Sequence, residues 1–121
     1  MELLKLTPAF SVCKLKDLSQ VNYDDDYLLI GKTDEELSLV CSTAYVPENV
    51  TDREDGWRGF RIQGVLDFSM IGILSKISTI LAGCAIGIFV VSTFNTDYVL
   101  VKAVDFDKAL GALAAEGYRF I

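Results

Sequence analysis

The chain has 121 residues, a length typical of one domain or of two small ones that share a core. Apolar residues make up 51% of it, which excludes global disorder. It carries 11 basic and 17 acidic side chains and no histidine, for a formal net charge of −6. An acidic chain without a basic cluster is poorly suited to binding nucleic acid, and the lack of histidine excludes Ser-His-Asp and Cys-His catalytic sites.

The net charge lies entirely in the first half of the chain. Residues 1–60 carry six basic and twelve acidic side chains, whereas residues 61–121 carry five of each. The polar stretch 49–56 between them has almost nothing to bury and predicts a linker or a long loop. We therefore expect two modules, at residues 1–56 and 57–121.

The first half is rich in predicted strands and less regular than the second. Its polar residues 16–26 predict only a short turn, and residues 44–50 predict one turn of helix or none. We interpret this half as a degenerate copy of the second module that lacks one good helix. The strands expected from alternation and β-branched content are residues 3–6, 10–15, 27–31 and 37–41.

The second half predicts a complete supersecondary unit. Ser69 is the expected N-cap of the first helix and Asp105 that of the second, while Gly83 and Gly117 are expected to end them. The order β-α-β-β-α-β predicts an α+β, ferredoxin-like fold, with an antiparallel four-stranded sheet and both helices on one face. The elements expected are strand 59–66, a helix to about residue 82, strands 86–92 and 98–102, a helix from residue 105 and strand 118–121.

Residues 77–96 carry no charge and are long enough to cross a bilayer, which raises the alternative of a membrane span. The apolar period changes inside this run, from helical spacing before Gly83 to a β-branched, strand-like pattern after it. No basic cluster flanks the run to set an orientation. We therefore expect a helix followed by a strand, and no membrane insertion.

The cysteines and the amino terminus indicate the compartment. Cys13, Cys41 and Cys84 stand far apart in apolar surroundings, which predicts reduced core thiols. The first residues lack the pattern of a secretory signal, so we expect a cytoplasmic protein. Nothing in the sequence predicts a metal site or a cofactor.

Two motifs of the second half resemble the ACT domain of a family of small tandem-ACT proteins, of which the cytosolic arginine sensors are more distant members. They are LDFSxxGIL at 66–74 and IGIFxxSTFxTDYxLV at 86–101, and the segments 10–15 and 33–41 of the first half are similar too. The resemblance implies two tandem ACT-like βαββαβ modules, the first degenerate. It further implies sheets that associate side by side, commonly also between subunits, and amino acids bound at the module interface.

The strand-to-helix loop is the first part of the expected ligand site. A zwitterionic amino acid needs hydrogen-bond donors for its carboxylate, and the amides of a helix N-terminus supply them. Gly72 has no side chain to keep a ligand from the backbone. The alternative is that Ser69 only caps its helix and Gly72 allows close packing on the sheet. The expected ligand-binding residues here are Ser69, Met70, Gly72 and Ile73.

The polar turn after the second predicted strand is the other expected part. The hydroxyls of Ser92, Thr93 and Thr96 can bind a ligand, and the Asp97 carboxylate can accept from an ammonium or a basic side chain. The resemblance implies that the matching acidic position in the arginine sensors contacts the guanidinium group. The alternative is an ordinary hairpin turn whose side chains bond their own backbone.

These observations predict a non-catalytic module that senses an amino acid and signals by a change in assembly or in partner binding. We expect a homodimer and a regulatory protein partner of unknown identity. The alternative from another class is a structural or interaction module whose pocket is filled by its own side chains. A membrane protein or an enzyme is not expected.

Overall fold

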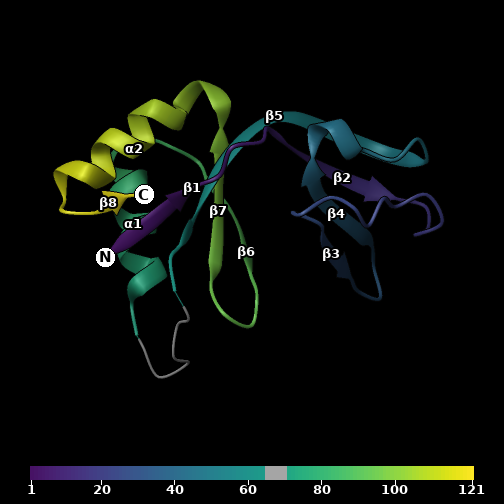
Figure 1. The fold of residues 1–121 in the computed structure, drawn as a ribbon, viewed down its shortest axis with the longest axis horizontal. Helices are drawn as coiled ribbons and strands as arrows, with labels where there is room; N and C mark the ends of the chain where they lie inside the picture. The colour runs from purple at the N-terminus through teal and green to yellow at the C-terminus, as the bar shows by residue number, and fades with distance from the viewer. Residues whose placement is uncertain (65–70) are drawn as a thin grey trace. The chain divides into compact units, whose positions relative to one another are not determined.

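The computed structural model describes residues 1–64 and 71–121, and they form two compact units (Figure 1). Unit 1 comprises Met1–Thr7 and Arg58–Ile121, and unit 2 comprises Pro8–Trp57. Unit 2 is therefore inserted into the chain of unit 1. The modules expected from the sequence, 1–56 and 57–121, differ from these units chiefly in the first seven residues, which pair with the second half of the chain.

Unit 1 contains a five-stranded sheet with the order β8–β1–β5–β7–β6. Its helices are α1 (Ile73–Gly83) and α2 (Phe106–Ala115), and the 3-10 turn η2 (Ala103–Asp105) leads into α2. The strands are β1 (Glu2–Lys5), the end of β5 (Val50–Ile62), β6 (Phe89–Ser92), β7 (Asp97–Lys102) and β8 (Arg119–Phe120).

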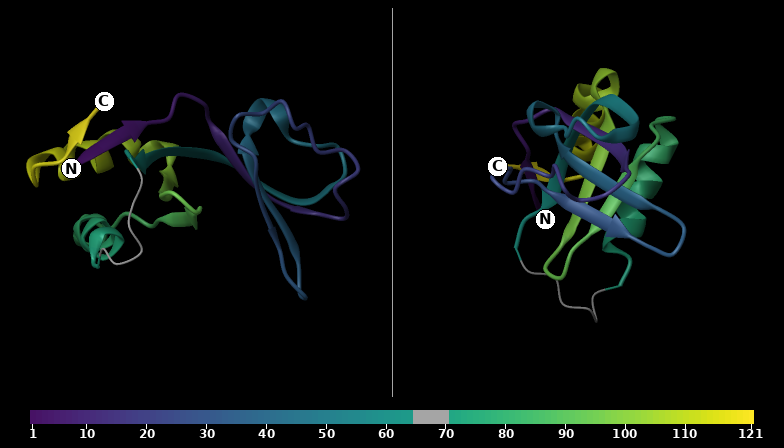
Figure 2. Two further views of the ribbon diagram at one scale, coloured as in Figure 1. Left: turned by 60° about the horizontal axis from the view of Figure 1, so that its bottom comes forward. Right: turned by 90° about the vertical axis from the view of Figure 1, so that its right-hand side faces the viewer.

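From β5 onward the elements follow the order β-α-β-β-α-β, so the α+β, ferredoxin-like fold predicted from the sequence is confirmed. The sheet contains one strand more than the four expected, because the first strand of the chain joins it. Strand β1 lies between β5 and β8, antiparallel to β5 and parallel to β8, and Figure 2 shows β1 and β8 side by side. The Arg119 guanidinium donates to the Glu2 carboxylate across this pair. Local patterning cannot reveal such a pairing between the two ends of a chain.

A single apolar core joins the sheet of unit 1 to its two helices. Alternate strand residues, which share one face of the sheet, supply half of this core, and the inner stripes of both helices supply the rest. One connected core therefore places both helices on the same face of the sheet. The residues are Leu3, Phe60, Ile62, Val99 and Val101 from the strands and Ile77, Leu81, Phe106, Ala109 and Leu113 from the helices.

At Gly59 of β5 the neighbouring strand β7 leaves no room for a side chain. A Cβ atom there would lie 2.4 Å from Cδ2 of Leu100 and 2.9 Å from the carbonyl oxygen of Val99. Neither distance is tolerable in a packed protein. The glycine therefore allows β5 and β7 to lie side by side.

The helix ends agree with the sequence at three of four positions. Helix α1 ends at Gly83, α2 has Asp105 as its N-cap, and Gly117 lies just after α2 with φ +93°. The prediction of Ser69 as N-cap of α1 is wrong, because the N-cap is Gly72. Ser69 itself lies outside the described residues.

Unit 2 is a four-stranded antiparallel arrangement with the order β3–β4–β2–β5. Its strands are β2 (Phe10–Leu15), β3 (Leu29–Lys32), β4 (Leu37–Ser42) and the first part of β5, and its helical element is the 3-10 turn η1 (Thr43–Tyr45). Buried residues of β2 and β4, including the free thiols of Cys13 and Cys41, form its core with Val21 from the loop. The absence of an α-helix in residues 8–57 agrees with a degenerate module.

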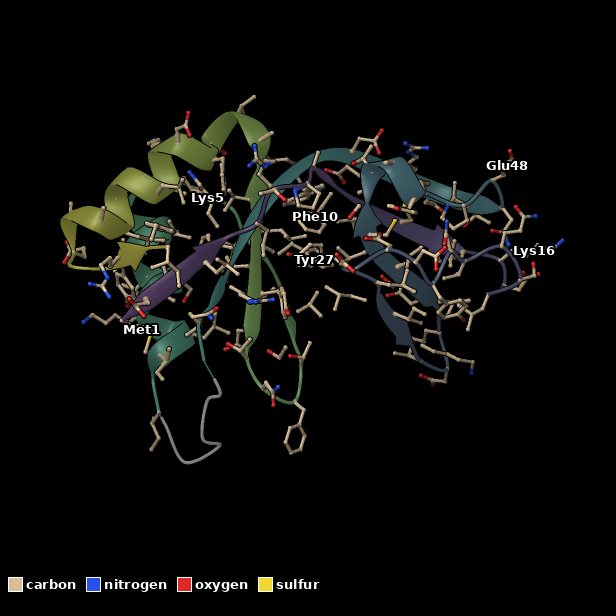
Figure 3. The ribbon with its side chains drawn as sticks, viewed as in Figure 1. Met1, Lys5, Phe10, Lys16, Tyr27 and Glu48 are labelled. Carbon is tan, nitrogen blue, oxygen red and sulfur yellow. The ribbon has the colours of Figure 1, made fainter. Side chains whose placement is uncertain are left out.

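The loop between β2 and β3 is anchored to this sheet by a buried carboxylate. Asp25 accepts hydrogen bonds from the Ser42 amide at 2.8 Å and the Ser42 hydroxyl at 2.7 Å. The neighbouring Tyr27 packs edge-on against Phe10 with ring centroids 5.6 Å apart (Figure 3). Asp25 therefore serves the fold, because its oxygens already accept hydrogen bonds from the chain.

The secondary structure of residues 50–56 and of the uncharged run 77–96 tests two further expectations from the sequence. Residues 50–56, predicted as a linker or loop, lie in strand β5, where they pair with β2. The uncharged run 77–96 contains the end of α1 and then β6, as its change of period predicted. No helix within residues 1–64 and 71–121 is long and apolar enough to cross a membrane.

Candidate functional site

A surface cavity of about 390 Å³ lies in unit 1 where α1 begins. This volume is within the range of ~300–1,000 Å³ typical of small-molecule sites. Figure 3 labels Met1, which contributes to the lining from the start of the chain. The lining residues come from three places in the sequence and are Met1, Ile71, Gly72, Ile73, Lys76, Glu116, Gly117 and Tyr118.

Gly72 forms the turn into α1 and opens the cavity. Its φ of +80° lies in the left-handed region, which side chains other than glycine's rarely adopt. Apart from its chain neighbours, no atom of the described residues lies within 4 Å of the place where a Cβ would stand, so contact with the described part of the sheet does not explain this glycine. Its carbonyl accepts the first helical hydrogen bond, from the Lys76 amide at 2.9 Å. The amides of the residues between them lack acceptors within the helix and carry partial positive charge.

Two side chains of opposite charge line the cavity without a partner. Lys76 belongs to the first turn of α1, and Glu116 follows the last turn of α2. Within the described part of the chain, neither the Lys76 ammonium nor the Glu116 carboxylate makes an ion pair or a side-chain hydrogen bond. Both side chains are exposed. Among the described side chains, the cavity therefore offers one unpaired cation from α1 and one unpaired anion from the residue that follows α2.

Tyr118 forms part of the same wall. Burial, and to a smaller extent the negative charge of Glu116, raises the pKa of its hydroxyl above the ordinary value of 10.0. The phenol is therefore neutral at physiological pH and can donate a hydrogen bond. With Ile71 and Ile73 it adds apolar surface to a cavity that also contains both charges.

The turn between β6 and β7 has a different character, because its polar groups bond one another. The Ser92 hydroxyl donates to the Asp97 carboxylate at 2.5 Å. The Thr93 hydroxyl donates to the Thr96 carbonyl at 3.0 Å, and the Thr96 hydroxyl, which is buried, donates to the Ile62 carbonyl at 2.8 Å. This is the pattern of an ordinary hairpin turn that secures the end of β5.

The structure thus separates the two parts of the predicted site. Gly72 and Ile73 line the cavity, whereas Ser92, Thr93, Thr96 and Asp97 do not. Ser69 and Met70 lie outside the described residues. The cavity also includes Lys76, Glu116 and Tyr118, which the sequence did not single out. Gly117, expected to end α2, lies between the last two.

Comparison with known proteins supports the fold. A family model described as the ACT domain matches residues 52–115. A comparison with curated proteins gives no match.

Solved structures give the same fold over almost the whole chain. A protein of Agobacterium tumefaciens is 32% identical, with a TM-score of 0.84 over 99% of this chain and 91% of that one. The aspartate kinase of Clostridium acetobutylicum is 18% identical, with a TM-score of 0.63 over 88% of this chain and 32% of the kinase. The regulatory subunit of aspartate kinase from Thermus thermophilus is 11% identical, with a TM-score of 0.57 over 89% and 92%.

At these low identities the two kinase structures support the fold alone. The family model covers more than half of the chain and includes β5, both helices and the strands between them. The chain therefore belongs to the ACT-domain family.

Proposed function

We propose that this chain is a regulatory module that binds an amino acid in the cavity at the start of α1. The observation that carries the proposal is that Lys76 of α1 and Glu116, just after α2, both line this cavity and have no charged partner among the described residues. An α-amino acid carries the same two charges close together, so it can satisfy both at once. Its carboxylate lies at Lys76 and the free amides of α1, and its ammonium lies at Glu116.

The cavity also has the openness that a reversible sensor requires. Gly72, Lys76 and Gly117 are exposed, so a ligand can enter from solvent without unfolding the chain. A module whose pocket is filled by its own side chains would instead present a closed surface here. The open cavity of about 390 Å³ favours the sensor over that alternative.

A regulatory role without catalysis agrees with the relatives. The similar Thermus thermophilus chain is a regulatory subunit, and the similar region of the Clostridium acetobutylicum protein is about a third of an allosteric kinase. A regulatory module acts when its ligand binds two states of the protein with different affinity. Here the output is a change in assembly or in binding to a regulatory protein partner, and the cytoplasmic location expected from the sequence stays a prediction.

The outer edge of β6 supports homodimer formation. Within the described residues β6 pairs only with β7, and Phe89, Val90 and Val91 are half-buried. No charged residue occurs between Lys76 and Asp97, whereas proteins usually protect a free edge with lysine or proline. By contrast, the part of β5 in unit 2 carries several exposed charges. A second copy that pairs with β6 would extend the sheet of unit 1.

Thermal unfolding of the purified chain with each of the twenty amino acids tests the proposal. An amino acid present at a hundred times its dissociation constant is expected to add about 2.7 kcal/mol to the free energy of unfolding. At the same ligand concentration the charge-removing variants Lys76→Gln and Glu116→Gln should lose about half of this stabilisation. Lys14→Gln and Glu36→Gln, which are exposed in unit 2, should keep it. If no amino acid stabilises the chain, the structural alternative stands.

Gly72→Leu, the obvious variant at the mouth of the cavity, is a poor test. With φ at +80° a leucine strains the backbone whether or not a ligand binds there. A loss of binding in that variant would not distinguish an occupied site from a damaged helix start. Charge removal at Lys76 and Glu116 leaves the backbone unchanged and is therefore the cleaner experiment.

A further inference from the structure

Resting on the proposed function, we infer that the ligand is an amino acid with an uncharged, apolar side chain, and that the cavity selects against charged ones. The inference follows from the charge balance of the lining. Among the described side chains that line the cavity, Lys76 is the basic one and Glu116 the acidic one. An α-amino acid uses both for its own ammonium and carboxylate.

A third charge on the ligand has no counterpart among the described side chains that line the cavity. The guanidinium of arginine or the ammonium of lysine could pair only with Glu116, in competition with the ligand's α-ammonium. The second carboxylate of aspartate or glutamate would compete in the same way for Lys76 and the amides of α1. Two like charges on the ligand therefore compete for one partner, so such ligands bind less well.

Asp97 would be the natural partner for a basic ligand side chain, and its surroundings oppose that role. Its carboxylate already accepts from the Ser92 hydroxyl at 2.5 Å. It is also not part of the cavity lining. The resemblance to the arginine sensors suggests a specificity for basic ligands. The acidic residue that this specificity would use, Asp97, does not line this cavity.

The remaining walls favour an apolar ligand. Met1 and Ile71 are 51% and 93% exposed, and Ile73 and Tyr118 are half-buried beside them. When an apolar group of a ligand covers exposed apolar surface beside a cavity, both surfaces leave water, and this favours binding. A branched aliphatic, thioether or aromatic side chain can cover these four residues while the ligand's charged groups reach Lys76 and Glu116.

Affinities measured by calorimetry for matched ligands test this specificity. L-Leucine, L-methionine and L-phenylalanine represent the expected class, and L-arginine, L-lysine, L-aspartate and L-glutamate the rejected one. We expect at least one of the first group to bind about tenfold more tightly than every member of the second. 3-Methylbutylamine and 4-methylpentanoate, which are leucine without its carboxylate and without its amine, complete the set.

The analogues assign each ligand charge to one side chain. Lys76→Gln should weaken leucine and 4-methylpentanoate about tenfold and leave 3-methylbutylamine unchanged. Glu116→Gln should weaken leucine and 3-methylbutylamine and leave 4-methylpentanoate unchanged. The exposed variants Lys14→Gln and Glu36→Gln should leave all three unchanged.

The possible results separate this inference from the proposed function. If a charged amino acid binds as tightly as the apolar ones, the inference is overturned, while amino-acid binding stands. If leucine binds but neither Lys76→Gln nor Glu116→Gln weakens it, the cavity at α1 is not the binding site, and both the proposed function and the inference fail. If no amino acid of either group binds, the proposed function fails and the inference fails with it.

Discussion

Two polar corners of unit 1 look alike in the sequence and differ in the structure. The start of α1 contains Lys76, whose ammonium has no partner in the described part of the chain, and a left-handed glycine that exposes the helix amides. The turn between β6 and β7 contains Ser92 and Asp97, which bond each other, and Thr96, which bonds the end of β5. Polar composition is therefore a poor guide to a binding site, because what matters is which polar groups are already satisfied.

This difference predicts that substitutions at the two corners have opposite consequences. A change in the β6–β7 turn should lower the free energy of unfolding and leave ligand affinity unchanged. Charge removal at the α1 corner should lower affinity and leave stability unchanged. The following predictions test this contrast, in order of decreasing effect on stability.

Thr96→Val should have the largest effect. It removes the 2.8 Å hydrogen bond from the threonine hydroxyl and leaves the buried Ile62 carbonyl without that donor. We expect a loss of about 1–3 kcal/mol in the free energy of unfolding, measured by urea denaturation. Thr79→Val, at an exposed position of α1, is the matched control and should change stability by less than about 0.5 kcal/mol. Equal effects of the two variants would contradict the structural role of the turn.

Gly72→Ala should destabilise the chain through its backbone alone. A side chain at φ +80° costs roughly 1–2 kcal/mol, although there is space for the methyl group itself. Gly83→Ala is the control, because that glycine has an ordinary φ and open space around it. It should be neutral or stabilising by roughly 0.4–1 kcal/mol. Urea denaturation of both variants measures the difference, and a harmless Gly72→Ala would disprove the left-handed helix start.

Ser92→Ala should have a smaller effect, because the hydrogen bond that it removes is exposed to solvent. We expect a loss below about 1 kcal/mol in the free energy of unfolding. Amino-acid affinity should not change when it is measured by calorimetry. A tenfold loss of affinity in this variant would show that the β6–β7 turn belongs to the binding site.

Tyr118 should contribute to the pH dependence of the free energy of unfolding. Its pKa is raised in the folded chain, so its stabilising contribution is complete below the ordinary value of 10.0 and is lost as the pH rises through the folded pKa. The wild-type chain should therefore lose stability above about pH 10 more steeply than Tyr118→Phe. Urea denaturation at pH values on either side of 10 compares the two. Identical slopes would contradict the burial of this hydroxyl.

The sequence was a good guide wherever local patterning decides the structure. Strand 10–15 is β2 at the predicted residues, and Gly83 ends α1 as its position after the apolar helix suggested. It was a poor guide to pairing between distant segments. Residues 50–56 look like a loop because their side chains are charged and exposed, yet their backbone pairs with β2. The insertion of β1 beside β8 is likewise invisible to any local pattern.

The candidate site was predictable only in part, for the same reason. Gly72 could be picked out as a residue at the start of a helix, but the sequence does not show whether its neighbours leave a cavity or fill it. Glu116 and Tyr118 reach this cavity from the far end of the module, more than 40 residues away in sequence. The polar turn at 92–97 has the composition of a binding site, but composition does not show which of its groups bond one another.

The most direct test of the account is an amide chemical-shift titration of the isotope-labelled chain by NMR with L-leucine. If leucine binds in the cavity at the start of α1, the largest amide shifts should occur at Ile73 and Lys76 in α1 and at Glu116 and Tyr118 after α2. The amide signals of Thr93 and Thr96 should hardly change. Large shifts in the β6–β7 turn with none at the start of α1 would contradict it.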